Sequence, residues 1–378
     1  MGRRQAVLAG VMVILSLWLP SVAQAASTPL TTSSPAVTTL PAYYKFTKTV
    51  TLTNTGNASA LNVDAKVVLL APPSAYAHVS LSGYSEEPQS TYTDKYGNLI
   101  GVYQWSNLKP GQSVSLVLHY EATSSDVSYH LPQVYGSYNV SSSVYKQYTN
   151  PKLEAQAVDT NAPEIKALDH QLVGHITNPY VRAETLFNWI AKNIQYNYSL
   201  KASGSALATL NSRLGICSDI ADLYVGMLRT DGIPAQLIGG YVTNNGDGQG
   251  GFHQWVEFYL PHSGWVVADP TWKYGYFASL QDDWHIPLYD GIRPDISVNW
   301  QYAKSNAGSP YMQINYHYHF VTEQSPPATH HAKLPLVSVT PPVAKHHVVA
   351  RTMESEWARI VNAVRNYFLR LKIALESL

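Results

Sequence analysis

The sequence of 378 residues contains a single cysteine, Cys217. A lone cysteine excludes a framework of internal disulfides, which is the usual use of cysteine outside the cytosol. Neither sign of charge is in excess, since Lys and Arg together number 25 and so do Asp and Glu. The chain therefore lacks the basic excess typical of nucleic-acid binding, and we expect no nucleic-acid partner. Only 13% of the residues are charged while 27 are tyrosines, a composition that favours a β-rich extracellular protein.

The apolar run from Val7 to Leu19 is too short to span a membrane comfortably. It follows the basic residues Arg3 and Arg4 and precedes the small-residue stretch Ala23-Gln24-Ala25, which offers a cleavage site. These features predict a signal peptide at residues 1–25, and hence a secreted, extracytoplasmic or cell-surface protein. An uncleaved membrane anchor is the alternative.

After the signal, composition and pattern divide the chain into five segments. Residues 27–40 are rich in Ser, Thr and Pro and indicate a flexible spacer. Residues 41–125 contain short alternating strands with turns between them, and they show no good helical pattern. This segment predicts an all-β immunoglobulin-like sandwich that acts as a spacer or docking module. The remaining segments are an α+β domain at 152–320, a Pro- and His-bearing linker at 321–350 and a helix at 351–378.

Two helices and three strands are expected in the α+β segment. Apolar residues recur at helical spacing in 183–194 and again from Cys217 to Arg229, where Asp231-Gly232-Ile233-Pro234 provides a stop. Strands are expected at 235–242, 252–260 and 265–268. Helices followed by strands predict an α+β fold.

Cys217, His253 and Asp269 follow one another in the order of a nucleophile, its base and the group that orients the base. Cys217 is expected at a helix N-terminus, where the helix dipole stabilises a thiolate. Asp269 closes the strand that follows the strand of His253. A three-residue loop at 261–263 would place Asp269 opposite Trp255 and on the same sheet face as His253. A four-residue loop without a bulge would place the two on opposite faces.

Several short motifs around these residues resemble the transglutaminase-like superfamily over about residues 152–290. They are Trp189-Ile190, Ile194-Gln195-Tyr196, Gly215-Ile216-Cys217, Asp219, Ala221, Arg229, Gly232-Ile233-Pro234-Ala235, Gly240-Tyr241, His253-Gln254-Trp255-Val256-Glu257, Gly264-Trp265 and Asp269-Pro270-Thr271. The resemblance implies a papain-like α+β core. It also implies that Cys217 is the nucleophile, His253 the general base and acid, and Asp269 the orienting carboxylate.

The sequence departs from the family pattern in two places. Ser218 follows the cysteine where animal transglutaminases carry Trp, and Gln254 follows His253 where family members often have a small residue. The first departure weakens the case for protein crosslinking. No acidic cluster resembles the calcium sites of the animal enzymes, because Asp247, Asp282 and Asp283 are scattered and are predicted to be surface charges.

The function that follows from these features is an exported cysteine peptidase or amidase that acts on a protein or peptide, for which location alone suggests the cell envelope. A protein-crosslinking transglutaminase and a catalytically silent cell-surface binding or assembly module are the alternatives. We expect no metal or other cofactor, since no Cys/His motif has zinc spacing. Aromatic residues are candidates for the substrate cleft, with ordinary core packing as the alternative role. They are Trp189, Tyr196, Tyr241 and Trp255.

The segment 351–378 has apolar residues in alternating steps of four and three, which predicts an amphipathic helix. Arg359, Arg365, Arg370 and Lys372 give it basic character. Membrane-surface contact, self-association and packing on the catalytic domain all remain open for this helix.

Overall fold

A computed structural model describes residues 36–38, 41–132, 135–243, 250–292, 296–302 and 309–323. All of them lie in the first of two units of the chain, residues 1–330. The expected signal peptide at 1–25 and helix at 351–378 lie outside the described residues, as does most of the linker at 321–350. No described helix is both long enough and apolar enough to cross a membrane.

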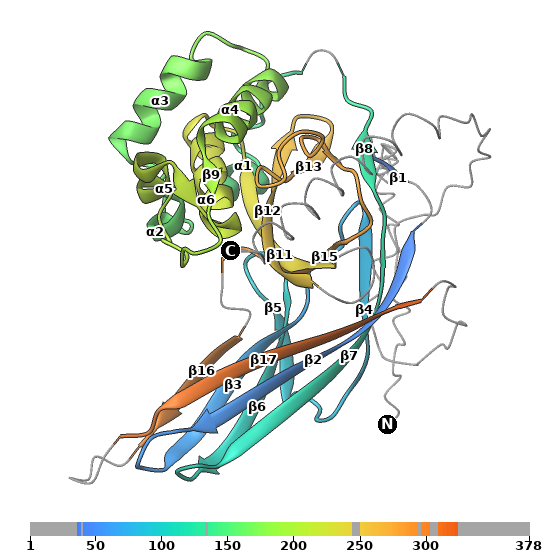
Figure 1. The fold of residues 1–378 in the computed structure, drawn as a ribbon, viewed down its shortest axis with the longest axis vertical. Coiled ribbons are helices and arrows are strands. Elements are labelled where there is room, and N and C mark those ends of the chain that lie inside the picture. The colour runs from blue at the N-terminus through green and yellow to red at the C-terminus, as the bar shows by residue number, and fades with distance from the viewer. Residues whose placement is uncertain are drawn as a thin grey trace, which may run out of the picture. The chain divides into compact units, whose positions relative to one another are not determined.

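Two antiparallel four-stranded sheets pack face to face in the lower part of Figure 1. Side chains alternate along the strands, so Val50 and Leu52 are buried while Thr49 and Thr51 are partly exposed. Phe46 stacks on Tyr120 of the neighbouring strand in the shared core. One sheet has the order β17-β2-β7-β4, comprising Met312–Glu323, Ala42–Asn54, Ser113–Ser124 and Ala77–Tyr84. The other has the order β16-β3-β6-β5, comprising Ile296–Gln301, Ala60–Leu70, Leu99–Leu108 and Ser90–Thr93.

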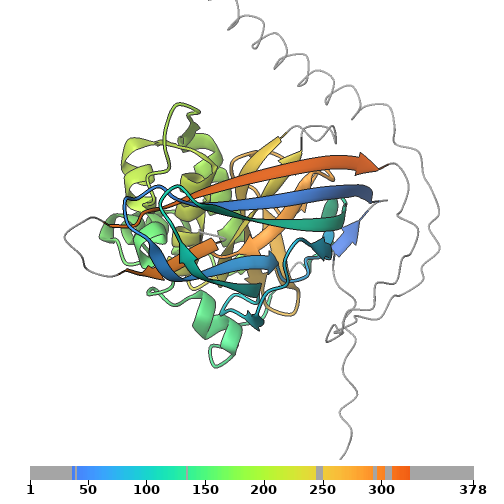
Figure 2. The ribbon, with the colours of Figure 1, turned by 90° about the horizontal axis from the view of Figure 1, so that it is seen from below.

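Two strands of this sandwich come from the far end of the described chain, which differs from the expected domain boundaries. Strand β17 pairs with β2 from Met312 opposite Asn54 to Glu323 opposite Tyr43, and β16 pairs with β3. Figure 2 shows β17, in orange, beside the blue β2. Residues 296–323 therefore complete the sandwich, although the sequence placed most of them in the domain 152–320. Alternation identifies a strand but not its partner. The immunoglobulin-like character of the sandwich stays a prediction.

The expected spacer also differs in one place. Strand β1 (Ala36–Thr38) pairs with β8 (Val127–Tyr129), which pairs in turn with β14 (Ser279–Leu280). The end of the segment 27–40 is thus held in a small sheet rather than free of partners.

The second part of the fold combines helices with a sheet of order β13-β12-β11-β15. The predicted helices and strands are present, with ends that differ by a few residues. Asn178 caps the second long helix by accepting a hydrogen bond from the N–H of Tyr180 at 3.0 Å. The helices are α1 Ser143–Tyr148, α2 Ala155–Val158, α3 Pro163–Val173, α4 Pro179–Asn193, α5 Ala206–Ser212 and α6 Cys217–Thr230. The strands are β11 Ala235–Thr243, β12 Gly250–Leu260, β13 Gly264–Ala268 and β15 His285–Asp290, with the short parallel pair β9 Gln195–Tyr196 and β10 Leu214–Gly215.

Helix α6 is buried almost all round, between the sheet and the other helices (Figure 1). Leu223 and Met227 of α6 belong to the same apolar cluster as Val256 and Phe258 of β12. Burial of side chains of this size stabilises the fold by about 2 kcal/mol each. Arg229 is 3% exposed and fixes the end of the helix through the carbonyls of Ala235 and Leu153 and the carboxylate of Glu154, each at 2.9 Å.

Strand β15 joins the sheet to the sandwich. Its residues Ile286, Leu288 and Tyr289 belong to the sandwich core cluster. The hydroxyl of Ser124, at the end of β7, donates to the carbonyl of His285 at 2.9 Å. At the other end of β15, Asn98 exchanges two hydrogen bonds of 2.8 Å with the backbone of Asp290. The sandwich therefore fixes the strand that begins at His285.

Candidate active site

Cys217 is the first residue of α6 and is only 9% exposed. The helix begins there because Asp219 accepts a hydrogen bond from the N–H of Ile216 at 3.0 Å, which satisfies a free donor of the first turn. The other carboxylate oxygen of Asp219 accepts from the N–H and hydroxyl of Ser203, at 2.7 and 2.8 Å. Asp219 thus anchors the helix start, and Cys217 lies at the positive end of the helix dipole.

His253 and Asp269 meet because of the hairpin formed by β12 and β13. The register runs from Leu260 opposite Gly264 to Val256 opposite Ala268, which confirms the three-residue loop at 261–263. One further step along both strands places Asp269 on the sheet face of His253. The distance from His253 Nε2 to Asp269 Oδ2 is 2.6 Å, and both side chains are buried.

The imidazole of His253 also forms a hydrogen bond with the thiol of Cys217. Because Nε2 faces Asp269, Nδ1 is the nitrogen left for the sulfur. The backbone N–H of Gln254 donates to the same sulfur. The structure therefore brings the three predicted residues together in the order sulfur, imidazole, carboxylate.

Electrostatics in this group favour an ionised thiol. Burial alone would raise the pKa of Cys217, but the hydrogen bond and charge of His253 outweigh it and the pKa is lowered. Burial would lower the pKa of His253, whereas the Asp269 carboxylate raises it to about 10. Burial works against ionisation of Asp269 too, but His253, followed by His285, holds its pKa below the usual range. A thiolate beside an imidazolium is the reactive form of a cysteine nucleophile.

Asp269 has further partners that the sequence reasoning missed. Its Oδ1 accepts from the N–H groups of Thr271 and Trp272, at 2.8 and 3.3 Å. Its Oδ2 also lies 3.3 Å from Nε2 of His285, whose Nδ1 lies 2.8 Å from Oδ1 of Asp282. Asp282 is 8% exposed, so its prediction as a surface charge is wrong. The available signal was an Asp and a His three residues apart, shortly after the Asp269 motif.

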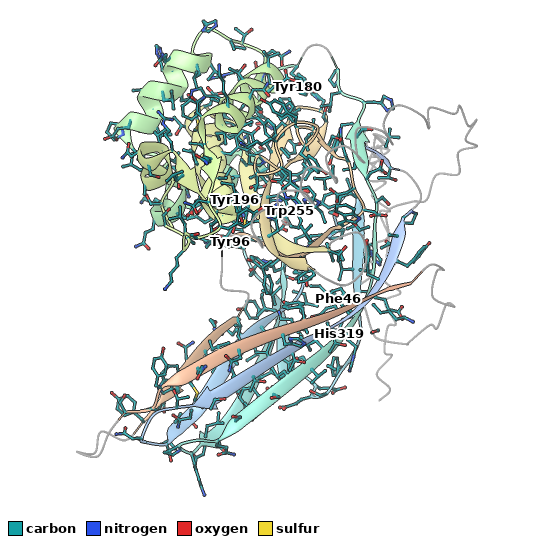
Figure 3. All side chains as sticks on the ribbon, in the orientation of Figure 1. Phe46, Tyr96, Tyr180, Tyr196, Trp255 and His319 are labelled. Atoms are coloured by element: carbon teal, nitrogen blue, oxygen red, sulfur yellow. The ribbon has the colours of Figure 1, made fainter. Side chains whose placement is uncertain are left out.

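Tyr196 is the one predicted cleft residue that the structure places at the sulfur. It lies on β9, opposite Gly215 of β10, and its hydroxyl forms hydrogen bonds with the backbone and the side chain of Cys217. Burial, followed by Cys217, raises the pKa of Tyr196 to about 12, so the hydroxyl is a donor at neutral pH. The ring packs against exposed Tyr198, with centroids 4.6 Å apart. Figure 3 labels Tyr196 near the helices and Trp255 on the sheet.

The other three predicted cleft aromatics have different surroundings. Trp255 is fully buried, so it does not line a substrate surface; it stacks on His253 and donates to the hydroxyl of Tyr76 at 2.8 Å. Tyr241 packs in the sandwich core cluster, stacked on Tyr318. Trp189 packs against the helical core with the guanidinium of Arg213 over its ring, 4.6 Å from the centroid. Core packing, the alternative role, describes these three.

Gln254, one of the two departures from the family pattern, ties β12 to α6. Its side-chain amide donates to Oδ1 of Asp222 at 3.2 Å, and both residues are buried. Burial raises the pKa of Asp222 to about 8, and neighbouring Asp219 adds to the effect. Gln254, next to His253, therefore has a structural role, because its side chain links β12 to α6 by a hydrogen bond.

His253, Asp269 and His285 could also be considered as metal ligands, since their donor atoms lie within 4.8 Å of one another. Each of these atoms is already engaged in the hydrogen bonds described above. Hydrogen bonding accounts for their proximity, and we assign no metal to this group.

Comparison with known proteins gives a consistent answer for this part of the chain. Residues 166–270 match the family model of the transglutaminase-like superfamily. An uncharacterised protein from Haemophilus influenzae is 29% identical over 159 residues, which cover 33% of this chain and 43% of that protein. A protein-glutamine gamma-glutamyltransferase from Pseudomonas aeruginosa is 31% identical over 91 residues, which cover 21% of this chain and 14% of that protein. The chain thus spans less than half the length of these relatives.

The solved structure of a candidate cysteine protease from Cytophaga hutchinsonii is also similar, with a TM-score of 0.55 and 16% identity. The similarity covers 77% of this chain and 94% of that one, and at this identity it concerns the fold alone. It extends well beyond the residues that match the family model. Residues 166–270 thus match the model of the transglutaminase-like superfamily, and they stand in a mixed fold of many strands and several helices.

Proposed function

We propose that this protein is an exported cysteine acyl-transfer enzyme that hydrolyses amide bonds of peptides or proteins. One observation carries the proposal: the buried ring of His253 is bonded through one nitrogen to Asp269, at 2.6 Å, and through the other to Cys217. A silent domain has no need to keep a nucleophile, a base and an orienting carboxylate in this order. Export rests on the predicted signal peptide at 1–25.

In the proposed reaction the Cys217 thiolate attacks the carbonyl carbon of the substrate amide. The oxyanion that forms accepts hydrogen bonds from the backbone N–H of Cys217 and from the hydroxyl of Tyr196. This hydroxyl lies beside both the backbone and the side chain of Cys217. His253 gives its Nδ1 proton to the amide nitrogen, the C–N bond breaks, and the amine leaves. The acyl group then remains on sulfur as a thioester.

The second half of the reaction returns the enzyme to its starting state. His253 takes a proton from water, the hydroxide attacks the thioester carbonyl, and the C–S bond breaks to release the acid and the thiolate. Asp269 keeps the proton on Nε2 of His253 throughout, so that Nδ1 is always the nitrogen that exchanges protons.

Transfer to an amine is the second candidate reaction. The Pseudomonas aeruginosa relative is a protein-glutamine gamma-glutamyltransferase, which favours this alternative. If a lysine amine replaces water in the second half, the product is an isopeptide crosslink. The same three residues serve both reactions, and the acceptor decides between them.

The first experiment needs no substrate. We would follow alkylation of Cys217 by iodoacetamide against pH in the wild type and in His253→Ala, with His262→Ala, in the hairpin loop at 261–263, as a control. Rapid labelling that persists below about pH 6 and is lost only in His253→Ala supports a His-stabilised thiolate. Labelling of the wild type that rises only near about pH 8.5 contradicts the proposal.

A second experiment separates the two reactions. The protein is incubated with casein and a fluorescent primary amine, and both new N-termini and incorporated fluorescence are measured, with Cys217→Ala as the inactive control. We expect new N-termini without fluorescence for hydrolysis of peptide bonds. Fluorescent casein without new N-termini would establish amine transfer instead.

A further inference from the structure

A second buried charge pair lies behind Asp269. His285 Nε2 lies 3.3 Å from Asp269 Oδ2, and His285 Nδ1 lies 2.8 Å from Asp282 Oδ1. His285 is fully buried, and its carbonyl accepts a hydrogen bond from Ser124 of the sandwich. Cys217, His253, Asp269, His285 and Asp282 thus form one continuous chain of hydrogen-bonded groups.

The two histidines on Asp269 have different surroundings. Each nitrogen of His285 faces a carboxylate oxygen, and a carboxylate accepts hydrogen bonds but does not donate them. Both nitrogens of His285 must therefore carry protons, which makes it an imidazolium. His253 faces a carboxylate on one side and a thiol on the other, so it can lose or gain a proton at Nδ1.

We propose that His285, held by Asp282, is a fixed buried cation that positions Asp269 for His253 and stabilises the thiolate of Cys217. The inference rests on the proposed function and assigns two residues to its machinery. It makes His285 and Asp282 positioning residues, since they reach the sulfur only through Asp269 and His253.

The surroundings of His285 support a permanent charge. Its ring is packed edge-on against Trp255 and Trp272, at centroid distances of 5.0 and 4.8 Å, and Tyr276 lies at 6.1 Å. The titratable groups that face it are Asp269, Asp282, His253 and Tyr276, and the pKa of Tyr276 is raised well above its usual value by burial and by Asp282. The carboxylates of Asp269 and Asp282 are the anions in hydrogen-bond contact with it.

The position of Asp269 depends on the same contact. Its Oδ1 is fixed by the N–H groups of Thr271 and Trp272, while Oδ2 is shared by His253 and His285. The pair of donors on Oδ2 keeps that oxygen aimed between the two rings. Without His285, Asp269 keeps its orientation through one donor fewer, and the site loses a positive charge.

Loss of that charge has a definite direction. Any anion nearby becomes harder to form, so the pH at which Cys217 ionises rises. The ring centroids of His253 and His285 are 5.7 Å apart. Cys217 lies beyond His253, and for charges roughly 10 Å apart an effective dielectric constant of about 20 gives an expected shift in the ionisation of Cys217 of about one pH unit.

Nuclear magnetic resonance on the full wild-type chain tests the protonation state directly. With ¹⁵N-labelled histidine, we expect the two ring nitrogens of His285 to keep the shifts of protonated nitrogens from pH 5 to pH 9. When the titration is continued to about pH 11, we expect Nδ1 of His253 to lose its proton near pH 10 while Nε2 keeps its own and both nitrogens of His285 stay protonated. An unprotonated ring nitrogen on His285 at pH 7 overturns the proposal.

The second test compares alkylation midpoints of Cys217 in matched variants. His285→Gln keeps a donor toward Asp269 but removes the cation, and we expect its midpoint to rise by about one pH unit. Asp282→Asn lets His285 lose its charge, so a smaller rise is expected. Asp283→Asn is the control. It makes the same Asp-to-Asn change at the half-buried residue next to Asp282, which has no hydrogen bond to His285.

The outcomes separate the two proposals. A low midpoint in the wild type that does not move in folded His285→Gln or Asp282→Asn overturns the role of His285 and leaves the proposed function intact. A wild-type midpoint near that of an ordinary thiol removes the proposed function, and the resonance experiment still decides the charge of His285. If His285→Gln does not fold, Asp282→Asn and the wild-type spectra carry the test.

Discussion

Asp269 reaches His253 across a hairpin, with 2.6 Å between Oδ2 and Nε2. The contact exists because the loop between β12 and β13 has three residues, which puts Asp269 on the sheet face of His253. A shift of one residue in this pairing would turn Asp269 to the opposite face. The geometry of the candidate site is therefore set by strand register as much as by the identity of its residues.

Replacing Asp269 by Asn should disable the thiol without removing the side chain's shape. The amide nitrogen of Asn can face Nε2 of His253 and favour the wrong ring tautomer, and the negative charge is lost. We expect alkylation of Cys217 at pH 6 to fall at least about tenfold. Unchanged alkylation in a folded variant would show that Asp269 does not orient His253. Asp126→Asn, the same chemical change at another position, is the control.

The raised pKa of His253 predicts a dependence of stability on pH. Burial alone would lower this pKa, but Asp269 raises it to about 10, above the ordinary value of 6.5. The folded state then holds the proton more tightly, so the contribution is complete below about pH 6.5 and is lost as the pH rises to about 10. Urea unfolding at pH 7 and pH 10 should show the wild type losing about 2 kcal/mol more than His253→Gln. Equal losses in both proteins would contradict the assignment.

Removal of the Tyr196 hydroxyl tests its proposed role as an oxyanion donor. Because Tyr196→Phe keeps the ring and removes only the donor beside Cys217, we expect kcat to fall about 10- to 100-fold with little change in KM. The measurement is the initial rate of casein cleavage. Tyr198→Phe is the matched control, since that ring is 88% exposed and its hydroxyl is not at the sulfur. A rise in KM alone would indicate substrate binding instead.

Asp222 should destabilise the folded protein at alkaline pH. Its pKa is raised to about 8, chiefly by burial, so the folded state binds a proton that the unfolded state releases near pH 3.8. Stability from this group is therefore lost as the pH rises between these two values. Asn cannot ionise, and we expect Asp222→Asn to gain about 3 kcal/mol over the wild type between pH 5 and pH 8.5. A difference that is constant with pH would show that Asp222 does not titrate in this range.

Strand β16 offers a test of the discontinuous sandwich. Ile296 is 1% exposed in the sandwich core, whereas its neighbour Ser297 is exposed. We expect Ile296→Ala to lower the free energy of unfolding by about 2–4 kcal/mol, and Ser297→Ala to change it by less than about 0.5 kcal/mol. Urea titration monitored by tryptophan fluorescence gives both values. Similar values for the two variants would place residues 296–301 outside the core.

Local signals explain which features were predictable from sequence. The α6 start at Cys217 follows from helical spacing, and strands β11 to β13 follow from their apolar runs. The turn between the strands of His253 and Asp269 could have had a three- or a four-residue loop. Only the three-residue loop places His253 and Asp269 on the same face. The structure selected that one. The superfamily resemblance is confirmed for residues 166–270, while the catalytic roles of Cys217, His253 and Asp269 stay predictions.

Long-range packing explains the differences. Trp255 and His253 lie on the same face of β12 because they are two residues apart. Whether Trp255 contacts substrate or the protein interior depends on Tyr76, which is far away in the chain. Tyr241 is buried because Tyr318 of β17 covers it. His285 and Asp282 carry no motif of their own, and their importance appears only where β15 brings them to Asp269.

The sequence by itself therefore determined the two helices and three strands that carry the candidate site and the order of its chemistry-bearing residues, because helix spacing and strand alternation are read within a few neighbouring residues. Tertiary structure alone decided that residues 296–323 return to the sandwich, that β15 is anchored by Ser124, and that a second histidine shares Asp269. These features depend on contacts between residues far apart in the chain. Strand pairing and buried hydrogen bonds of that kind are set by the packing of whole layers, which no local stretch of sequence encodes.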